Sequence, residues 1–181
     1  MDNGACSYRR YLDGDEEAFD EIMNELFDKL VFFINRYVRD YHAAEDIAMD
    51  AFADLIVHKN RYNFSVSLKT YLFMLGRSRA LTYLKRQHRR QTIPVEEAET
   101  TAFEEGVEAD YLRTEQHRAV HEAVERLPSD MCAAVHLVYF EELTYEEAAR
   151  VMKKNKKQID NLLYRAKQEL RLTLGKEGVL L

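Results

Sequence analysis

The chain has 181 residues, enough for one medium domain or two small ones. Hydrophobic residues make up 46% of it, and only two prolines and six glycines occur, which favours helices over turn-rich sheets. No apolar run is longer than that from Leu30 to Ile34, which is far shorter than the roughly 18 residues of a membrane span. With two cysteines and no secretion signal expected at the N-terminus, the sequence predicts a reduced, cytoplasmic protein.

The net charge is −6, which by itself argues against a nucleic-acid partner, but the basic residues are clustered. From Leu55 to Val95 there are nine lysines or arginines and no acidic residue. From Lys153 to Arg171 there are seven basic residues against two acidic ones. Local clusters of this kind attract phosphate even when the whole chain is acidic, although a solvated helix face would have the same composition.

The first zone, from residue 8 to about 91, has the pattern of successive amphipathic helices. Gly14-Asp15 resembles a helix start with Asp15 as N-cap, and apolar residues then recur four apart from Ala18 to Leu30. A second helix is expected from about Ala43, and a third from about Leu68 to Arg90. This third helix is apolar and aromatic in its first part and basic in its second.

One side of the second predicted helix carries an acidic row. Asp46, Asp50 and Asp54 are four residues apart, so they share a face of the helix. Residues this polar and this regular are expected to be exposed. They form either a contact surface for a partner or a merely solvated face.

The segment 92–114 is predicted to be a weakly ordered linker. It opens near Pro94 and has low hydrophobicity and charge of one sign. From Glu96 to Glu115 the only basic residue is Arg113, whereas eight residues are acidic: Glu96, Glu97, Glu99, Glu104, Glu105, Glu108, Asp110 and Glu115. Such a segment contributes nothing to a core and repels DNA.

The last zone, residues 115–181, is predicted to contain a helix-turn-helix. Thr144 and Glu147 have the spacing of a capping box, and a short helix follows them. After the polar residues Lys153 to Asn155, a longer helix continues with Ile159 and Leu162 on its inner face. The outer face of this helix is basic and amide-rich, as major-groove docking requires, although a helical hairpin with a lysine-rich rim remains possible.

Taken together, the two helical units resemble the extracytoplasmic-function (ECF) sigma factors of bacterial RNA polymerase. The order and spacing of several stretches carry the resemblance: Gly14 to Phe19, Ala44 to Ile47, Tyr71 to Arg86, Arg126 to Pro128, Leu143 to Ala149 and Tyr164 to Lys167. The chain departs from the family pattern at Met49, Tyr71, Ser78 and Asp160, where glutamine, tryptophan, asparagine and arginine are usual.

The resemblance implies an all-α protein of two small helical domains joined by an acidic linker. Residues 1–91 would be the sigma region 2 bundle, which binds the polymerase clamp and the minus-10 promoter element. Residues 92–114 would be the flexible linker, lying in a basic channel of the polymerase. Residues 115–181 would be the sigma region 4 helix-turn-helix, which binds the minus-35 element and the polymerase flap.

The same resemblance assigns site residues in three groups. Those expected to bind polymerase are Glu45, Asp46, Met49 and Asp50. Those expected to bind minus-10 DNA are Tyr62, Arg77, Ser78, Arg79, Tyr83, Lys85 and Arg86. Those expected to bind minus-35 DNA are Lys156, Lys157, Gln158, Asp160, Asn161 and Arg165. Lys156 and Lys157 would hold phosphate at the helix start and Asn161 would read a base, while Asp160 is expected to pair with one of the two lysines rather than with a cytosine.

The expected partners are core RNA polymerase, promoter DNA and an anti-sigma factor, and no cofactor is expected. A protein-only helical adaptor and a conventional helix-turn-helix regulator are the alternatives. An enzyme is not expected, because no acid–cysteine–histidine cluster is evident in the sequence. No glycine-rich phosphate loop occurs either, so the use of ATP or GTP is not indicated. His117 and His121 lie four apart but lack the glutamate of a zinc-protease motif, so a structural role is expected for them and no metal site.

Overall fold

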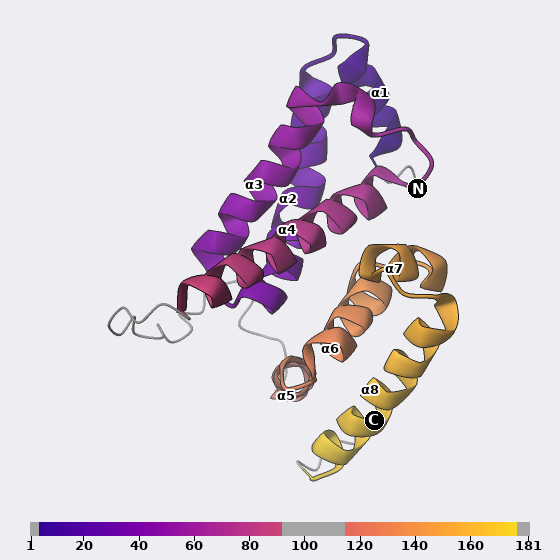
Figure 1. Cartoon of the computed structure of the whole chain (residues 1–181). Helices are drawn as coiled ribbons and strands as arrows, with labels where there is room; N and C mark the ends of the chain where they lie inside the picture. Colours follow the sequence, from indigo (N-terminus) through magenta and orange to yellow (C-terminus); the bar gives the residue numbers. More distant parts are fainter. Residues whose placement is uncertain (1–3, 92–114, 177–181) are drawn as a thin grey trace.

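A computed structural model describes residues 4–91 and 115–176, and in these ranges it contains helices and no strand (Figure 1). The first unit, residues 4–91, contains α1 (Ala5–Leu12), α2 (Glu17–Val38), α3 (Tyr41–Val57) and α4 (Leu68–Gln91), with a short 3-10 turn at Lys59–Arg61. The second unit, residues 115–176, contains α5 (Glu115–Glu125), α6 (Ser129–Val135), a π-helical turn at His136–Phe140, α7 (Tyr145–Met152) and α8 (Lys156–Lys176). The all-helical expectation is confirmed for these residues. None of their helices is long and apolar enough to cross a bilayer.

The core of the first unit lies between α2, α3 and α4. The predicted row from Ala18 to Leu30 is buried along α2, and Ala48 and Phe52 of α3 face it. The smallest residue of α4, Gly76, lies against α2, where an added Cβ would stand 2.8 Å from Leu30 Cδ1. α4 therefore packs very closely on α2 at this point.

Local capping groups begin the helices close to where the sequence predicts. Asp15 Oδ1 accepts a hydrogen bond from the Ala18 N–H just ahead of α2, and the Asp40 side chain accepts one from Ala43 at the start of α3. The capping box is confirmed at α7, where Thr144 Oγ1 accepts from the Glu147 N–H and Glu147 Oε2 accepts from the Thr144 N–H. Each of these bonds satisfies an N–H group that the helix itself leaves free.

The second unit is built around α6 and α8. The side chains of α6 are buried almost throughout, and Ile159, Leu163 and Ala166 of α8 pack toward them. Cys132 is buried in α6, as a small core residue is expected to be.

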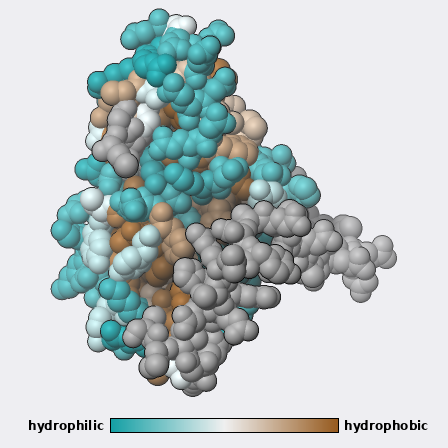
Figure 2. Space-filling view, turned by 180° about the vertical axis from the view of Figure 1, so that it is seen from behind, coloured by the Kyte–Doolittle hydropathy of each residue, from teal (hydrophilic) through white to brown (hydrophobic). Residues whose placement is uncertain are grey.

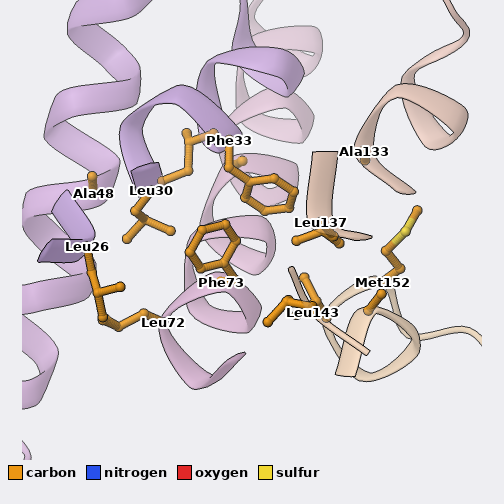
Figure 3. Close-up of a cluster of buried hydrophobic side chains, with 14 of the residues drawn as sticks. Leu26, Leu30, Phe33, Ala48, Leu72, Phe73, Ala133, Leu137, Leu143 and Met152 are labelled. Carbon is orange, nitrogen blue, oxygen red and sulfur yellow. The ribbon is translucent and has the colours of Figure 1, made fainter. Parts of the chain in front are cut away.

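The two units pack on one another, and their buried side chains form one continuous cluster. Figure 3 shows Phe33 of α2 and Phe73 of α4 facing Leu137 and Leu143 of the second unit. On the opposite face of the molecule from Figure 1, Figure 2 shows a hydrophobic area between two hydrophilic ends. The segment 92–114, predicted to be a linker, lies outside the described residues.

Candidate nucleic-acid interface

The second unit contains a helix-turn-helix formed by α7 and α8. α7 ends at Met152, and the C-cap residue Lys153 has φ 53° and ψ 44°, the left-handed conformation that glycine usually supplies. Ala149 is nearly fully buried, as a residue at a helix crossing must be. This arrangement leaves the front of α8 exposed.

The start of α8 is held by a second reciprocal cap. Gln158 Oε1 accepts from the Asn155 N–H at 2.9 Å, and Asn155 Oδ1 accepts from the Gln158 N–H at 2.8 Å. The spacing of Asn155 and Gln158 is that of a capping box and is visible in the sequence, yet the sequence analysis did not identify it. Gln158, predicted to bind DNA, has its side-chain oxygen committed to this cap.

Lys156 pairs with α7 rather than with its own helix. Its Nζ lies 2.6 Å from Glu146 Oε1, and this hydrogen bond lowers the pKa of Glu146 below its ordinary value. Asp160 is exposed and forms no direct ion pair with any residue that the structure describes, although its charge helps to raise the pKa of Lys156. The predicted pairing of Asp160 with Lys156 or Lys157 is therefore wrong as a direct contact. Glu146 of α7 lies close enough to Lys156 to pair with it in place of Asp160.

The rest of the predicted reading face of α8 is exposed. Lys157, Asn161 and Arg165 all point away from the core. Asn161 and Arg165 line a shallow hollow together with Lys154 and Gln158. The structure thus brings an amide and several cations together on one surface.

The predicted minus-10 residues of α4 divide into exposed and half-buried side chains. Ser78, Lys85 and Arg86 are exposed, and Tyr83 is half-buried. Arg77 is also half-buried, and its Nε donates a hydrogen bond to the Tyr37 hydroxyl at 3.3 Å. The basic second part of α4 therefore presents most of its charge to solvent.

Arg79 is held by an acidic residue of α3. Its Nη2 lies 2.8 Å from Asp54 Oδ2, and Arg61 Nη1 lies 3.3 Å from the same oxygen. His58 Nε2 stands 3.7 Å from Asp54 Oδ1. The Asp54 side chain is only 13% exposed, so the prediction of a fully exposed row is wrong at this residue. Asp54 joins α3 to α4.

Tyr62 is a core residue in this structure. It is 3% exposed, its hydroxyl donates to the Val66 carbonyl at 2.7 Å, and its ring lies against Tyr8, Phe64 and Tyr71. A base could stack on it only if this aromatic cluster opened. The prediction that Tyr62 contacts single-stranded DNA is therefore corrected.

The predicted polymerase residues lie together on α3. Asp46 is exposed, and the side chain of Asp50 is 71% exposed and stands 3.6 Å from Arg79. Met49 is 51% exposed between them. Glu45 is half-buried and pairs with His42 at 3.5 Å. An exposed methionine flanked by acids is a surface suited to a partner that is basic and partly apolar.

The described residues contain no cluster of three potential metal ligands. His121 lies against Phe32 and pairs with Glu125 at 3.6 Å, in agreement with a structural role. The side chain of His117 lies outside the described residues.

Two family models match the chain. The model "Sigma-70 region 2" matches residues 22–90, and "Sigma-70, region 4" matches residues 117–170. These ranges contain the proposed polymerase face of α3, the basic part of α4 and the helix-turn-helix.

Curated relatives and solved structures agree with these matches. The ECF RNA polymerase sigma factor SigM of Bacillus subtilis is 26% identical over 85% of this chain and 93% of its own length. The RNA polymerase sigma-H factor of Pseudomonas aeruginosa is 28% identical over 87% and 86%.

Among solved structures, the sigma factor RpoE of Bartonella quintana, in complex with the anti-sigma factor NepR, shares the fold. Its TM-score is 0.65 at 19% identity, covering 87% of this chain and 96% of that one. CnrH, in complex with the cytosolic domain of CnrY, has a TM-score of 0.66 at 15% identity over 97% and 99%. On the matches to both regions and to these curated relatives, the chain belongs to the extracytoplasmic-function sigma factors of bacterial RNA polymerase.

Proposed function

We propose that this sigma factor binds core polymerase through α3, contacts the minus-10 element with the basic part of α4 and contacts the minus-35 element with α8. In this proposal residues 1–91 and 115–181 act as two domains joined by the linker 92–114. The factor works in the cytoplasm, where polymerase and promoters are, and performs no catalysis of its own. An anti-sigma factor is proposed as a further partner, because the similar RpoE was solved in complex with one.

The observation that carries the proposal is the separation of charge between surfaces. The exposed face of α3 is acidic, with Asp46 and Asp50, whereas the exposed ends of α4 and α8 are basic. A basic surface attracts the phosphate backbone, while an acidic face is repelled by it. One molecule can therefore bind a protein and DNA through different surfaces, which adjoin where Asp50 stands 3.6 Å from Arg79.

The experiment on the polymerase face is a charge reversal. Asp46→Lys combined with Asp50→Lys is expected to weaken binding to core polymerase and leave the fold intact, since both side chains are exposed. The matched control is Glu25→Lys with Asp28→Lys, an equal change of charge on the exposed side of α2. Equal affinity of both double variants for core polymerase would exclude α3 as the contact.

On α8, phosphate contacts and base contacts should be separable. Lys157→Ala should weaken binding to every minus-35 duplex and lower the salt slope by about one. Asn161→Ala should cost roughly 1–3 kcal/mol on the preferred duplex and little on a scrambled one. Arg171→Ala, which removes an exposed cation near the other end of α8, is the control.

Salt titrations of the polymerase complex on matched and scrambled duplexes measure both effects. Equal weakening of the two duplexes by Asn161→Ala would exclude it as a base reader. Complete absence of DNA binding, with polymerase binding retained, would favour a protein-only adaptor. For promoter melting, Arg86 is a cleaner probe than Arg79, because Arg79 is already paired with Asp54.

A further inference from the structure

A buried polar cluster joins the two units. Lys69 of α4 donates a hydrogen bond to the Glu141 carbonyl at 2.7 Å, and its Nζ lies 2.8 Å from Glu141 Oε2. His136 Nε2 lies 3.2 Å from Glu141 Oε1. The side chains of these three residues are 11%, 4% and 3% exposed respectively. Water has almost no access to an ion pair that crosses from one unit to the other.

The π-helical turn places this cluster. Its hydrogen bond runs from the Glu141 N–H to the His136 carbonyl at 3.0 Å, so the chain widens by one residue before it leaves the helix. The imidazole of His136 stacks between Phe33 of α2 and Phe140 of its own turn. Glu141 then lies between the imidazole and the lysine.

The cluster is only partly satisfied. His136 Nδ1 has no hydrogen-bond partner among the described residues, and neither do Nε and Nη2 of Arg36, which also belongs to α2. Arg36 and Lys69 both act to lower the pKa of His136, and Glu141 acts to raise it, while burial has the largest effect and leaves the pKa lowered. Charges and polar atoms buried in this way cost desolvation free energy that their attraction repays only in part. This polar cluster therefore adds little favourable free energy to the contact between the two units.

Promoter geometry requires the two units to separate. Elements named minus-10 and minus-35 lie about 25 base pairs apart, which is about 85 Å of duplex at about 3.4 Å per base pair. A compact chain of this length has a radius of gyration of about 16 Å. A protein of that size cannot cover both elements while its halves remain packed together.

We propose that Lys69, Glu141 and His136 form a latch that holds the free factor closed, and that the latch opens before the factor occupies both promoter elements. This inference rests on the proposed function only for its second half. The closed arrangement lowers the fraction of molecules that can reach both promoter elements, so any change that breaks the latch raises that fraction.

Small-angle X-ray scattering of the full chain tests the first half. Lys69→Met leaves the buried carboxylate of Glu141 without its cation, and we expect the radius of gyration to rise from about 16 Å to above about 20 Å while helicity is retained. The double variant Lys69→Met/Glu141→Leu replaces the pair by apolar side chains of similar size and is expected to stay compact. Lys29→Met, which removes an exposed lysine of α2, is the control and should not change the radius.

Glu141→Gln provides an independent variant if Lys69→Met fails to fold, because it removes the charge and keeps the shape. A radius near 16 Å in both single variants overturns the latch, and so does a radius above about 20 Å in the unaltered protein.

The second half is tested with core polymerase present, by the apparent affinity for a duplex that carries both elements, which should rise severalfold in Glu141→Gln. An affinity that stays constant while the radius increases overturns this half. The scattering experiment contains neither polymerase nor DNA, so its failure and a failure of promoter recognition are distinguishable.

Discussion

Replacing Gly76 with alanine tests how closely α4 packs on α2. Alanine is favoured over glycine within a helix by about 1 kcal/mol. Its Cβ would, however, stand 2.8 Å from Leu30 Cδ1 and 3.0 Å from Ile34 Cδ1, well inside the ordinary contact distance of about 3.5–4.0 Å. Both contacted side chains are fully buried, so any shift of their methyl ends displaces other core side chains.

Overpacking of this kind costs about 1–3 kcal/mol, and we expect the upper part of that range because both contacted side chains are fully buried. We therefore expect Gly76→Ala to destabilise the protein by about 1–2 kcal/mol net and to lower Tm by about 3–6 °C. Urea and thermal unfolding followed by circular dichroism measure this change.

Gly175→Ala is the matched control, because an added Cβ there meets nothing within 4 Å. It should be neutral or stabilise by a few tenths of a kcal/mol, since it lies near the end of α8. A Gly76→Ala protein as stable as the unaltered one would refute the close approach of the two helices.

Three further predictions follow from the caps, the latch and the linker. Thr144→Ala removes one half of the capping box and should cost about 1 kcal/mol, measured by urea unfolding. Burial lowers the pKa of His136 from its ordinary 6.5. Burial alone would raise the pKa of Glu141, but the hydrogen bonds that Glu141 accepts from His136 and Lys69 leave its pKa below 4.5. The closed state therefore binds fewer protons than the open one, so its stability relative to the open state should fall as pH falls below about 6.5. Small-angle scattering from pH 7.5 to 5 should show an increase in the radius of gyration. If the radius is unchanged across this range while helicity persists, these groups do not control opening. Limited proteolysis should cut first within residues 95–112 and leave two stable fragments, and a single resistant core would argue against two domains.

Local features of the fold could be predicted from the sequence because their causes lie within a few residues. The Thr144–Glu147 cap, the apolar row along α2 and the limits of α4 each depend on neighbours one or two turns away. The exposure of Asn161 follows for the same reason, since the inner positions of α8 are occupied by apolar side chains.

Contacts between distant residues could not be predicted in this way. Lys69 and Glu141 are 72 positions apart, and nothing in either neighbourhood indicates that they meet. Tyr62 is preceded by an exposed cationic turn and looks available for stacking, but the packing of α1 and α4 covers its ring. Asp54 belongs to a regular acidic row, but unlike Asp46 it is reached by Arg79 of α4 and by His58 and Arg61, which follow α3.

The carboxylate of Asp54 has a consequence for how this surface exchanges ions. A free arginine that binds phosphate replaces a condensed counterion on the DNA, and each such contact adds about one to the salt slope. Arg79 already has an anion of its own, so a phosphate must displace Asp54, and the exchange releases less net charge to solution. Arg79→Ala should then change the salt slope of promoter binding by clearly less than one, whereas Arg86→Ala, at an exposed position, should change it by about one. Asp54 thus competes with phosphate for Arg79, which makes DNA binding by this part of the surface less sensitive to ionic strength than its number of arginines indicates.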